Sequence, residues 1–168
     1  MEEVDLLMAT FSKSLASVGG VVAGEAEVVE FLRHSARSLI FSASMPPASA
    51  AGVLAALDVM EDEPGHRERL WSNSRRLRRG LDELELEVRD SGTPIIPVEV
   101  GGVEETGRFW RALFDRGVFV HPVVPPAVPP NSCLIRVSVT AAHTGEQVDR
   151  VLEAFRGAVR EQRGSGGP

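Results

Sequence analysis

The chain has 168 residues, of which 43% are hydrophobic and 25% charged, and its net charge is -6. This length suffices for one ordinary domain, or for a small domain with a piece of another, and the composition is typical of a soluble globular protein. The negative charge argues against a nucleic-acid surface, whose affinity depends on Lys and Arg neutralising phosphates. No apolar run approaches the roughly 20 residues that cross a bilayer, and the acidic start Met1-Glu2-Glu3 lacks the basic region of a signal peptide, so we expect a cytoplasmic protein without a transmembrane segment.

The first 24 residues predict two strands that enclose a lysine. Residues 4–9 form a short apolar run typical of a buried strand, and residues 19–24 form a second, glycine-flanked one, with a helix expected over residues 25–37. The loop between the strands carries Lys13, the only lysine among 18 Lys and Arg residues. A buried strand needs neighbours, and none precedes residue 4 in this sequence, which is a first indication of a missing partner sheet.

Lys13 is the first candidate for covalent chemistry. A guanidinium stays protonated and is a poor nucleophile, whereas a partly desolvated lysine can lose its proton and form an imine. We therefore interpret Lys13 as a candidate Schiff-base residue. The alternative is a strong compositional bias toward arginine that left one lysine on the surface.

Two helices are expected in the middle of the chain. Pro46-Pro47 suits the opening of a helix, where a missing N–H costs little, and apolar residues recur at helical spacing from there to about Asp62. A second, longer helix is predicted from Pro64, with Gly80 as its weak point. We expect residues 46–92 to connect a first unit to a second.

From Thr93 the pattern changes to short strands that alternate with helices, which is typical of a small α/β sandwich. The predicted strands are residues 95–100, 118–120 and 134–139, and Pro97 indicates that the first of them lies at an edge or contains a bulge. A helix that buries Phe109, Leu113 and Phe114 is predicted over residues 104–116. A last helix follows Thr144, because Thr144 to Gln147 has the spacing of a capping box. The Pro-rich stretch 122–130 is predicted to be a loop, Cys133 a buried small apolar residue, and residues 164–168 a disordered tail.

Five ordered blocks of the sequence resemble one enzyme family. They are Thr10-Phe11-Ser12-Lys13 with Gly19-Gly20, residues 37–48, residues 94–98, Ile135-Arg136-Val137-Ser138, and Ala141-Ala142-His143-Thr144. In this order they resemble the α-oxoamine synthases, which are pyridoxal-phosphate enzymes of the aspartate aminotransferase fold. Residues 41–47 and the Pro-rich stretch are most similar to the bacterial serine palmitoyltransferase type.

The resemblance implies an α/β protein that forms the C-terminal portion of pyridoxal-phosphate fold type I. Residues 1–45 would be the lysine-bearing end of the large domain, residues 46–92 connecting helices, and residues 93–163 a complete small domain. The implied activity is the condensation of an acyl-CoA with a small amino acid, with loss of CO2 and CoA, in a homodimer. Two other enzymes of the family, 8-amino-7-oxononanoate synthase and glycine C-acetyltransferase, are alternatives. Another alternative is that the chain is a non-catalytic subunit or an interaction module.

The resemblance also assigns site residues. Lys13 would hold pyridoxal phosphate as a Schiff base and then move protons at the substrate α-carbon. Thr10 would donate to the cofactor phosphate, and Ser42 would reach that phosphate from the neighbouring subunit. Arg136 would grip the carboxylate of the amino acid. The structural alternatives are turn or cap bonding for Thr10 and Ser42, and an outward-facing strand residue for Arg136. His143 lies beside a predicted helix cap and is interpreted as structural, and no role is derived for His121.

Parts of the family pattern have no counterpart in these 168 residues. They are the glycine-rich phosphate loop, the histidine that stacks on the pyridine ring, and the aspartate that keeps the ring nitrogen protonated and the ring an electron sink. The chain therefore looks like the C-terminal part of a longer enzyme and is expected to be inactive alone. A misassigned start within a longer reading frame and a genuine separate subunit both remain open.

Overall fold

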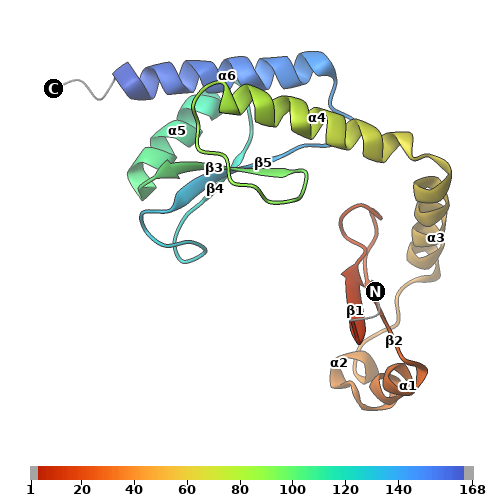
Figure 1. Ribbon diagram of the computed structural model, residues 1–168. Helices are drawn as coiled ribbons and strands as arrows, with labels where there is room; N and C mark the ends of the chain where they lie inside the picture. Colours follow the sequence, from red (N-terminus) through yellow and green to blue (C-terminus); the bar gives the residue numbers. More distant parts are fainter. Residues whose placement is uncertain (1–3, 165–168) are drawn as a thin grey trace. The chain divides into compact units, whose positions relative to one another are not determined.

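The computed structural model describes residues 4–164. The chain divides after Pro64 into two compact units (Figure 1). Residues 165–168 of the expected tail lie outside the described residues. None of the helices within residues 4–164 is long and apolar enough to cross a membrane. The same part of the chain contains no group of three or more His, Cys, Asp or Glu side chains able to hold a metal ion.

The first unit is a two-stranded hairpin followed by three helices. Strand β1 (Leu6–Thr10) pairs antiparallel with β2 (Gly20–Gly24), with Thr10 opposite Gly20. The helices are α1 (Ala26–Ser35), α2 (Arg37–Ile40) and α3 (Pro47–Asp62). Both strands were predicted, and so was the opening of α3 after Pro46-Pro47. The first helix ends before residue 37, because Ala36 takes an extended conformation and separates α1 from α2.

The hairpin exposes apolar side chains on both faces, as expected for strands whose partner sheet is missing from this sequence. Alternation along the strands places Leu6, Met8 and Val22 on one face and Leu7 and Val21 on the other. All five are at least 42% exposed in the described structure. Two strands cannot form a core by themselves, so this hairpin has the surface of an inner part of a larger sheet.

The second unit is a three-stranded antiparallel sheet with three helices. In chain order its elements are α4 (Gly65–Asp82), β3 (Ile95–Gly101), α5 (Val103–Asp115), β4 (His121–Val123), β5 (Cys133–Ser138) and α6 (Gly145–Gly164). The strand order is β3-β5-β4, so β5 is central. Arg163 and Gly164 belong to the last turn of α6, and the helix therefore extends one residue into the predicted tail.

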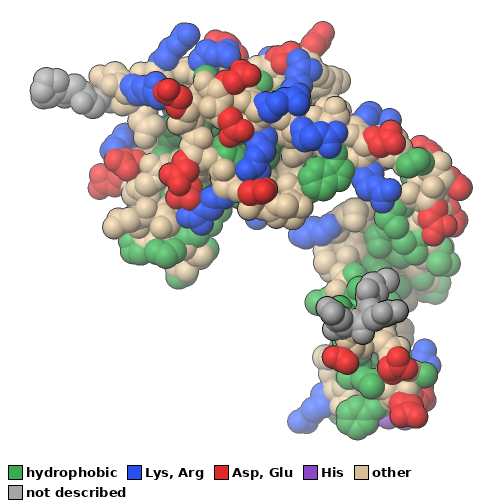
Figure 2. All heavy atoms as spheres, viewed as in Figure 1, with side chains coloured by type: hydrophobic (Ala, Val, Ile, Leu, Met, Phe, Trp, Pro, Cys, Tyr) green, Lys and Arg blue, Asp and Glu red, His purple; other side chains and the backbone are tan. Residues whose placement is uncertain are grey.

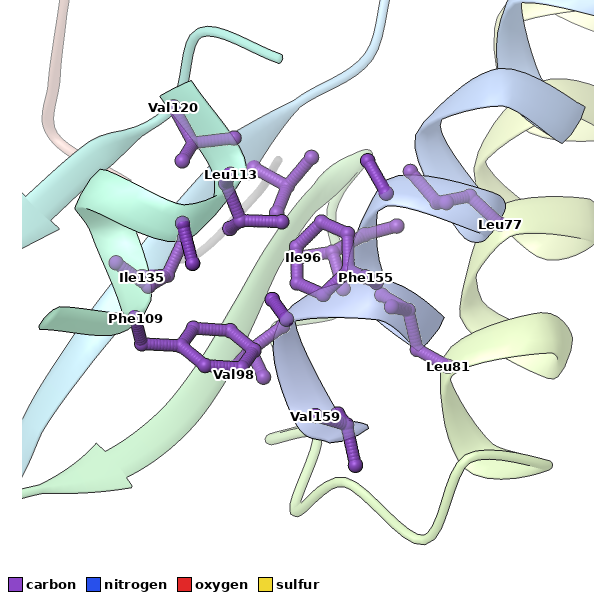
Figure 3. Close-up of a cluster of buried hydrophobic side chains, with 14 of the residues drawn as sticks. Leu77, Leu81, Ile96, Val98, Phe109, Leu113, Val120, Ile135, Phe155 and Val159 are labelled. Atoms are coloured by element: carbon purple, nitrogen blue, oxygen red, sulfur yellow. The ribbon is translucent and has the colours of Figure 1, made fainter. Parts of the chain in front are cut away.

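The core of this unit lies between one face of the sheet and the three helices (Figure 3). Its fully buried side chains come from all of these elements: Leu81 from α4, Ile96 and Val98 from β3, Phe109 and Leu113 from α5, Ile135 from β5, and Phe155 from α6. The rings of Phe109 and Phe155 pack edge to face with centroids 5.8 Å apart. Cys133 is fully buried and unpaired, as predicted.

The prediction of a strand over residues 118–120 is wrong, because pairing with β5 begins only at His121. The backbone groups of the predicted segment have other partners: the Val118 N–H donates to Leu113 O at the end of α5, and Trp110 Nε1 donates to Val120 O at 3.1 Å. Strand β4 therefore takes in Pro122, which was assigned to the Pro-rich loop. A proline is tolerated there because β4 is an edge strand.

Two local predictions for the second unit are confirmed, and a third is wrong. Pro97 lies in β3, an edge strand with a bulge between Glu99 and Gly101, as predicted. The capping box is present, with the Thr144 N–H bonded to Gln147 Oε1 at 2.8 Å. Phe114 was expected to be buried with its helix but is 45% exposed, where it packs against Trp110.

Candidate active site

The loop from Phe11 to Gly19 joins β1 to β2 and carries Lys13. Two backbone hydrogen bonds close its base: the Phe11 N–H donates to Gly19 O at 3.0 Å, and the Ser17 N–H donates to Phe11 O at 2.9 Å. The Phe11 side chain is only 8% exposed and anchors the loop, whereas the Lys13 side chain is exposed. The loop therefore presents its lysine from a base that is fixed at both ends.

A tight turn follows the lysine directly. The Ala16 N–H donates to the backbone carbonyl of Lys13 at 3.0 Å, and Ala16 has φ 48°. A residue with a Cβ in this left-handed region costs about 1–2 kcal/mol. Such strain is concentrated at functional sites, so the conformation of this turn supports a functional interpretation of the loop.

Two hydroxyl groups lie together beside the lysine in sequence. Thr10 Oγ1 and Ser12 Oγ are 2.9 Å apart, and the Ser12 N–H donates to Thr10 Oγ1 at 3.4 Å. Thr10 Oγ1 also donates to Gly19 O at 3.5 Å, which is the outer limit of a hydrogen bond. Thr10 thus takes part in local turn bonding, but its exposed hydroxyl is held only weakly.

The segment after α2 packs against this loop. Gly19 has φ 102°, and a Cβ built on it would lie 2.6 Å from Met45 Sδ, so a residue without a side chain is required there. Ser17 Oγ donates to Ser49 O at 3.1 Å. Ser42 precedes this contact region and is exposed, and its side chain has no hydrogen bond to Thr10 or Lys13 within residues 4–164.

Arg136 lies on the central strand of the second unit. Its neighbours Ile135 and Val137 point into the core, so the exposed Arg136 side chain lies on the opposite face, away from the helices. Its guanidinium has no hydrogen bond or ion pair with any residue between 4 and 164. The observed orientation is that of an outward-facing strand residue, and it leaves the guanidinium open to a ligand.

The sequence-predicted residues are therefore distributed over both units. Lys13 and Thr10 share one loop of the first unit, Ser42 lies in the same unit, and Arg136 lies in the second. Sequence reasoning assigned no role to His121, which the structure pairs directly with Arg136. No sequence signal shows this relation, because it depends on the register between β4 and β5.

His143 was interpreted as structural, and its contacts agree with that role. Its Nδ1 accepts a hydrogen bond from the Thr140 N–H at 3.2 Å. Asn73 of α4 donates to both Thr140 O and His143 O. These bonds hold the turn between β5 and α6 against α4.

Comparison with known proteins identifies the class. The family model for aminotransferase class I and II matches residues 1–155, so the chain belongs to that family. It is 49% identical over 154 residues to serine palmitoyltransferase of Sphingobacterium spiritivorum, covering 90% of this chain and 38% of the relative. It is 43% identical over 156 residues to a putative 8-amino-7-oxononanoate synthase of Desulforudis audaxviator, covering 93% of this chain and 40% of that protein. The chain thus spans about two fifths of the length of these relatives.

Solved structures give the same result. Serine palmitoyltransferase of Sphingomonas wittichii matches with a TM-score of 0.90 at 32% identity, over 96% of this chain and 41% of that one. The 8-amino-7-oxononanoate synthase of Francisella tularensis, at 22% identity and a TM-score of 0.81, shows the shared fold alone. These comparisons confirm the resemblance to the α-oxoamine synthases and the assignment to the α/β fold of pyridoxal-phosphate fold type I.

Proposed function

We propose that this chain carries the Schiff-base lysine and the carboxylate-binding arginine of a pyridoxal-phosphate-dependent acyltransferase of the α-oxoamine synthase kind. The full enzyme would condense an acyl-CoA with a small amino acid and release CO2 and CoA. Serine palmitoyltransferase activity is favoured over 8-amino-7-oxononanoate synthase and glycine C-acetyltransferase, because relatives with the first name reach 49% identity. The identity to relatives with the second name reaches 43%.

The residues of the loop fit pyridoxal phosphate by the chemistry of their donors. An aldehyde requires a primary amine, and Lys13 supplies the only lysine amine of the chain. A phosphate requires donors that make charge-assisted hydrogen bonds, and the exposed hydroxyls of Thr10 and Ser12 lie together 2.9 Å apart. All three side chains are open to a ligand.

Each residue has one role in this proposal. Bound pyridoxal phosphate would supply an electron sink for the substrate α-carbon. Lys13 Nζ would bond to the cofactor aldehyde and, once released by the incoming amino acid, move a proton at that α-carbon. Thr10 would donate to the phosphate, and Ser42 would do so from the second copy in a homodimer. Arg136 would hold the carboxylate of the amino acid with its planar fork.

The observation that carries the proposal is the exposed Lys13 on a loop that also presents Thr10 Oγ1. The test is to add pyridoxal phosphate to the 168-residue chain, reduce with borohydride and map the labelled peptides by mass spectrometry. We expect the label on Lys13. The concentration that gives half-maximal labelling should be lower for pyridoxal phosphate than for pyridoxal, which has no phosphate. Thr10→Val should weaken the phosphate-dependent preference by about tenfold or more, the equivalent of one hydrogen bond to a charged group.

Two results would contradict this proposal. One is labelling of the amino terminus in preference to Lys13. The other is equal labelling by pyridoxal and pyridoxal phosphate, which would make Lys13 an ordinary surface amine. We further expect the 168 residues alone to bind the cofactor weakly and to form no amino ketone, because they correspond to 38% of a full-length relative. Amino-ketone formation by the purified chain would disprove that expectation.

A role as a non-catalytic subunit or interaction module is the second candidate. The exposed apolar hairpin favours it, since such a surface is typical of association. Pairing with a full-length relative would be tested by co-expression and co-purification. Lys13 labelling that is unaffected by Thr10→Val, together with stable pairing, would favour this candidate over the enzyme. The homodimer and the cytoplasmic location are predictions that sedimentation and cell fractionation would check.

A further inference from the structure

The sheet of the second unit has one face without helices from its own unit. The side chains of Ile96, Val98, Ile135 and Val137 point into the core under the helices. Alternation puts the intervening residues on the opposite face, which we name the open face. Its members are Ile95, Pro97 and Glu99 of β3, His121 and Val123 of β4, and Leu134, Arg136 and Ser138 of β5.

His121 and Arg136 are direct neighbours on the open face. The register of β4 and β5, which run side by side in Figure 1, places His121 opposite Arg136, and that of β3 and β5 places Pro97 opposite Arg136 on the other side. Residues directly opposite in an antiparallel pair have Cβ atoms about 4.5–5.5 Å apart and side chains on the same side. Both His121 and Arg136 are exposed, so an imidazole and a guanidinium stand beside each other over the sheet.

No acceptor in the described chain engages this pair. Neither the imidazole of His121 nor the guanidinium of Arg136 has a hydrogen bond or ion pair with residues 4–164. The single carboxylate among the strand residues of the open face, Glu99, is already held by Arg89. The pair therefore offers two adjacent nitrogen donors to an anion from outside these residues.

The imidazole also has one aromatic neighbour. The ring of Phe119 contacts the His121 ring edge to face, with centroids 5.2 Å apart. The residue between them is buried, and its carbonyl accepts the hydrogen bond from Trp110 Nε1. The Trp110 bond thus fixes the backbone directly before His121.

We propose that His121 is a second carboxylate-binding residue, which shares one small carboxylate ligand with Arg136. The guanidinium would hold one carboxylate oxygen or both, and the imidazole would donate to one of them. Identification of that ligand with the amino-acid substrate rests on the function proposed above. His121 would then be a substrate-binding residue and would help to fix the orientation of the carboxylate over the open face.

The test uses the whole 168-residue chain labelled with ¹³C-histidine and ¹⁵N-arginine. L-Serine and sodium acetate are the probes, and sodium chloride at equal ionic strength is the control. We expect the His121 ring signals and the Arg136 Nε–H signal to shift together and to saturate at the same probe concentration. The signals of His34 and His66 should not move. Assignment comes from the His121→Ala and Arg136→Gln variants.

The variants then measure the contribution of each residue. Arg136→Gln should remove the saturable shift of His121, and His121→Ala, which leaves no side-chain donor, should weaken carboxylate binding at Arg136 by about threefold to tenfold, as expected for the loss of one hydrogen bond. His34→Ala, in the other unit, should change nothing. His121→Val provides a second variant without a donor if the Ala variant loses the dispersed spectrum of the folded chain.

Two outcomes would overturn the inference: saturable binding at Arg136 with no shift of His121 and no effect of His121→Ala, or no saturable binding of either probe. Neither outcome bears on the labelling of Lys13 by pyridoxal phosphate. The failure of this inference is therefore distinguishable from the failure of the proposed function.

Discussion

Gly80 of α4 lies so close to Leu152 of α6 that a Cβ atom on residue 80 would be 2.5 Å from Leu152 Cδ2. The missing side chain lets the two helices approach each other over the sheet. Sequence reasoning treated Gly80 as a weak point of its helix, but α4 continues through it to Asp82. Glycine lowers the stability of a helix, but at this position its missing side chain allows α4 and α6 to pack closely.

This contact predicts that Gly80→Ala destabilises the second unit. The added methyl would clash with both Leu152 methyl groups, and overpacking of this kind costs about 1–3 kcal/mol, of which the higher helix propensity of alanine offsets about 0.5–1 kcal/mol. Gly107→Ala in α5 is the matched control, because a Cβ atom on residue 107 would have nothing within 4 Å. That change should raise the free energy of unfolding by about 0.5–1 kcal/mol. Urea unfolding measures both, and equal stabilisation by the two changes would contradict the packing argument.

Phe155→Ala should be among the most damaging single changes. Phe155 is fully buried and packs edge to face on Phe109, so truncation should lower the free energy of unfolding by about 3–5 kcal/mol. Phe114→Ala is the control within the same unit, since Phe114 is 45% exposed. We expect it to cost less than half as much in the same thermal and urea unfolding experiments. Similar losses of stability for the two variants would contradict a central role of Phe155 in the core of the second unit (Figure 3).

The Arg89–Glu99 ion pair predicts a pH dependence of stability. The hydrogen bond from Arg89 lowers the pKa of Glu99 below its ordinary value of 4.5. A carboxyl whose pKa is depressed in the folded state contributes stability above the unfolded pKa. That contribution is lost as the pH falls through the folded pKa.

The Arg89→Gln variant tests this pair. It should raise the pKa of Glu99, measured by ¹³C NMR of the carboxyl, and reduce the loss of stability as the pH falls from neutrality through the pKa of Glu99. Glu99→Gln should reduce that loss in the same way while leaving no carboxyl to titrate. A Glu99 pKa that is unchanged by Arg89→Gln would rule the interaction out in solution.

The hairpin of the first unit predicts association of the purified chain. Met8 is 74% exposed and Val22, directly opposite it, is 43% exposed. Exposed strand edges and apolar faces of this kind promote pairing between chains. The double variant Met8→Lys with Val22→Thr should reduce association in sedimentation velocity and lower the binding of a hydrophobic dye. The matched control is Glu104→Lys with Val103→Thr, at the exposed start of α5, which should leave association as it is.

Charges of both signs cover the second unit on the face shown in Figure 2. Acidic and basic side chains are intermixed there, and neither sign forms a patch of its own. Ion pairs such as Arg76–Asp149 and Arg116–Glu161 join elements of the unit. The basic side chain of Arg76 is thus part of a mixed surface.

Local signals were read correctly from the sequence because the interactions behind them span only a few residues. The Thr144–Gln147 capping box and the opening of α3 at Pro47 depend on neighbouring backbone groups alone. The loop around Lys13 was also predictable, since two apolar runs separated by a short segment form a hairpin. The resemblance to the α-oxoamine synthases rested on ordered blocks of residues and needed no coordinates.

The sequence by itself determined the family, the candidate lysine and most of the helices and strands, because these follow from residue chemistry and hydrophobic periodicity. Only the tertiary structure decided that pairing with β5 begins at His121, because the carbonyl of the preceding Val120 bonds to Trp110 instead. It alone brought His121 beside Arg136, two residues that are separated by a Pro-rich segment in the chain. The register between strands and the packing between helices depend on contacts between distant residues, and a linear pattern does not contain them.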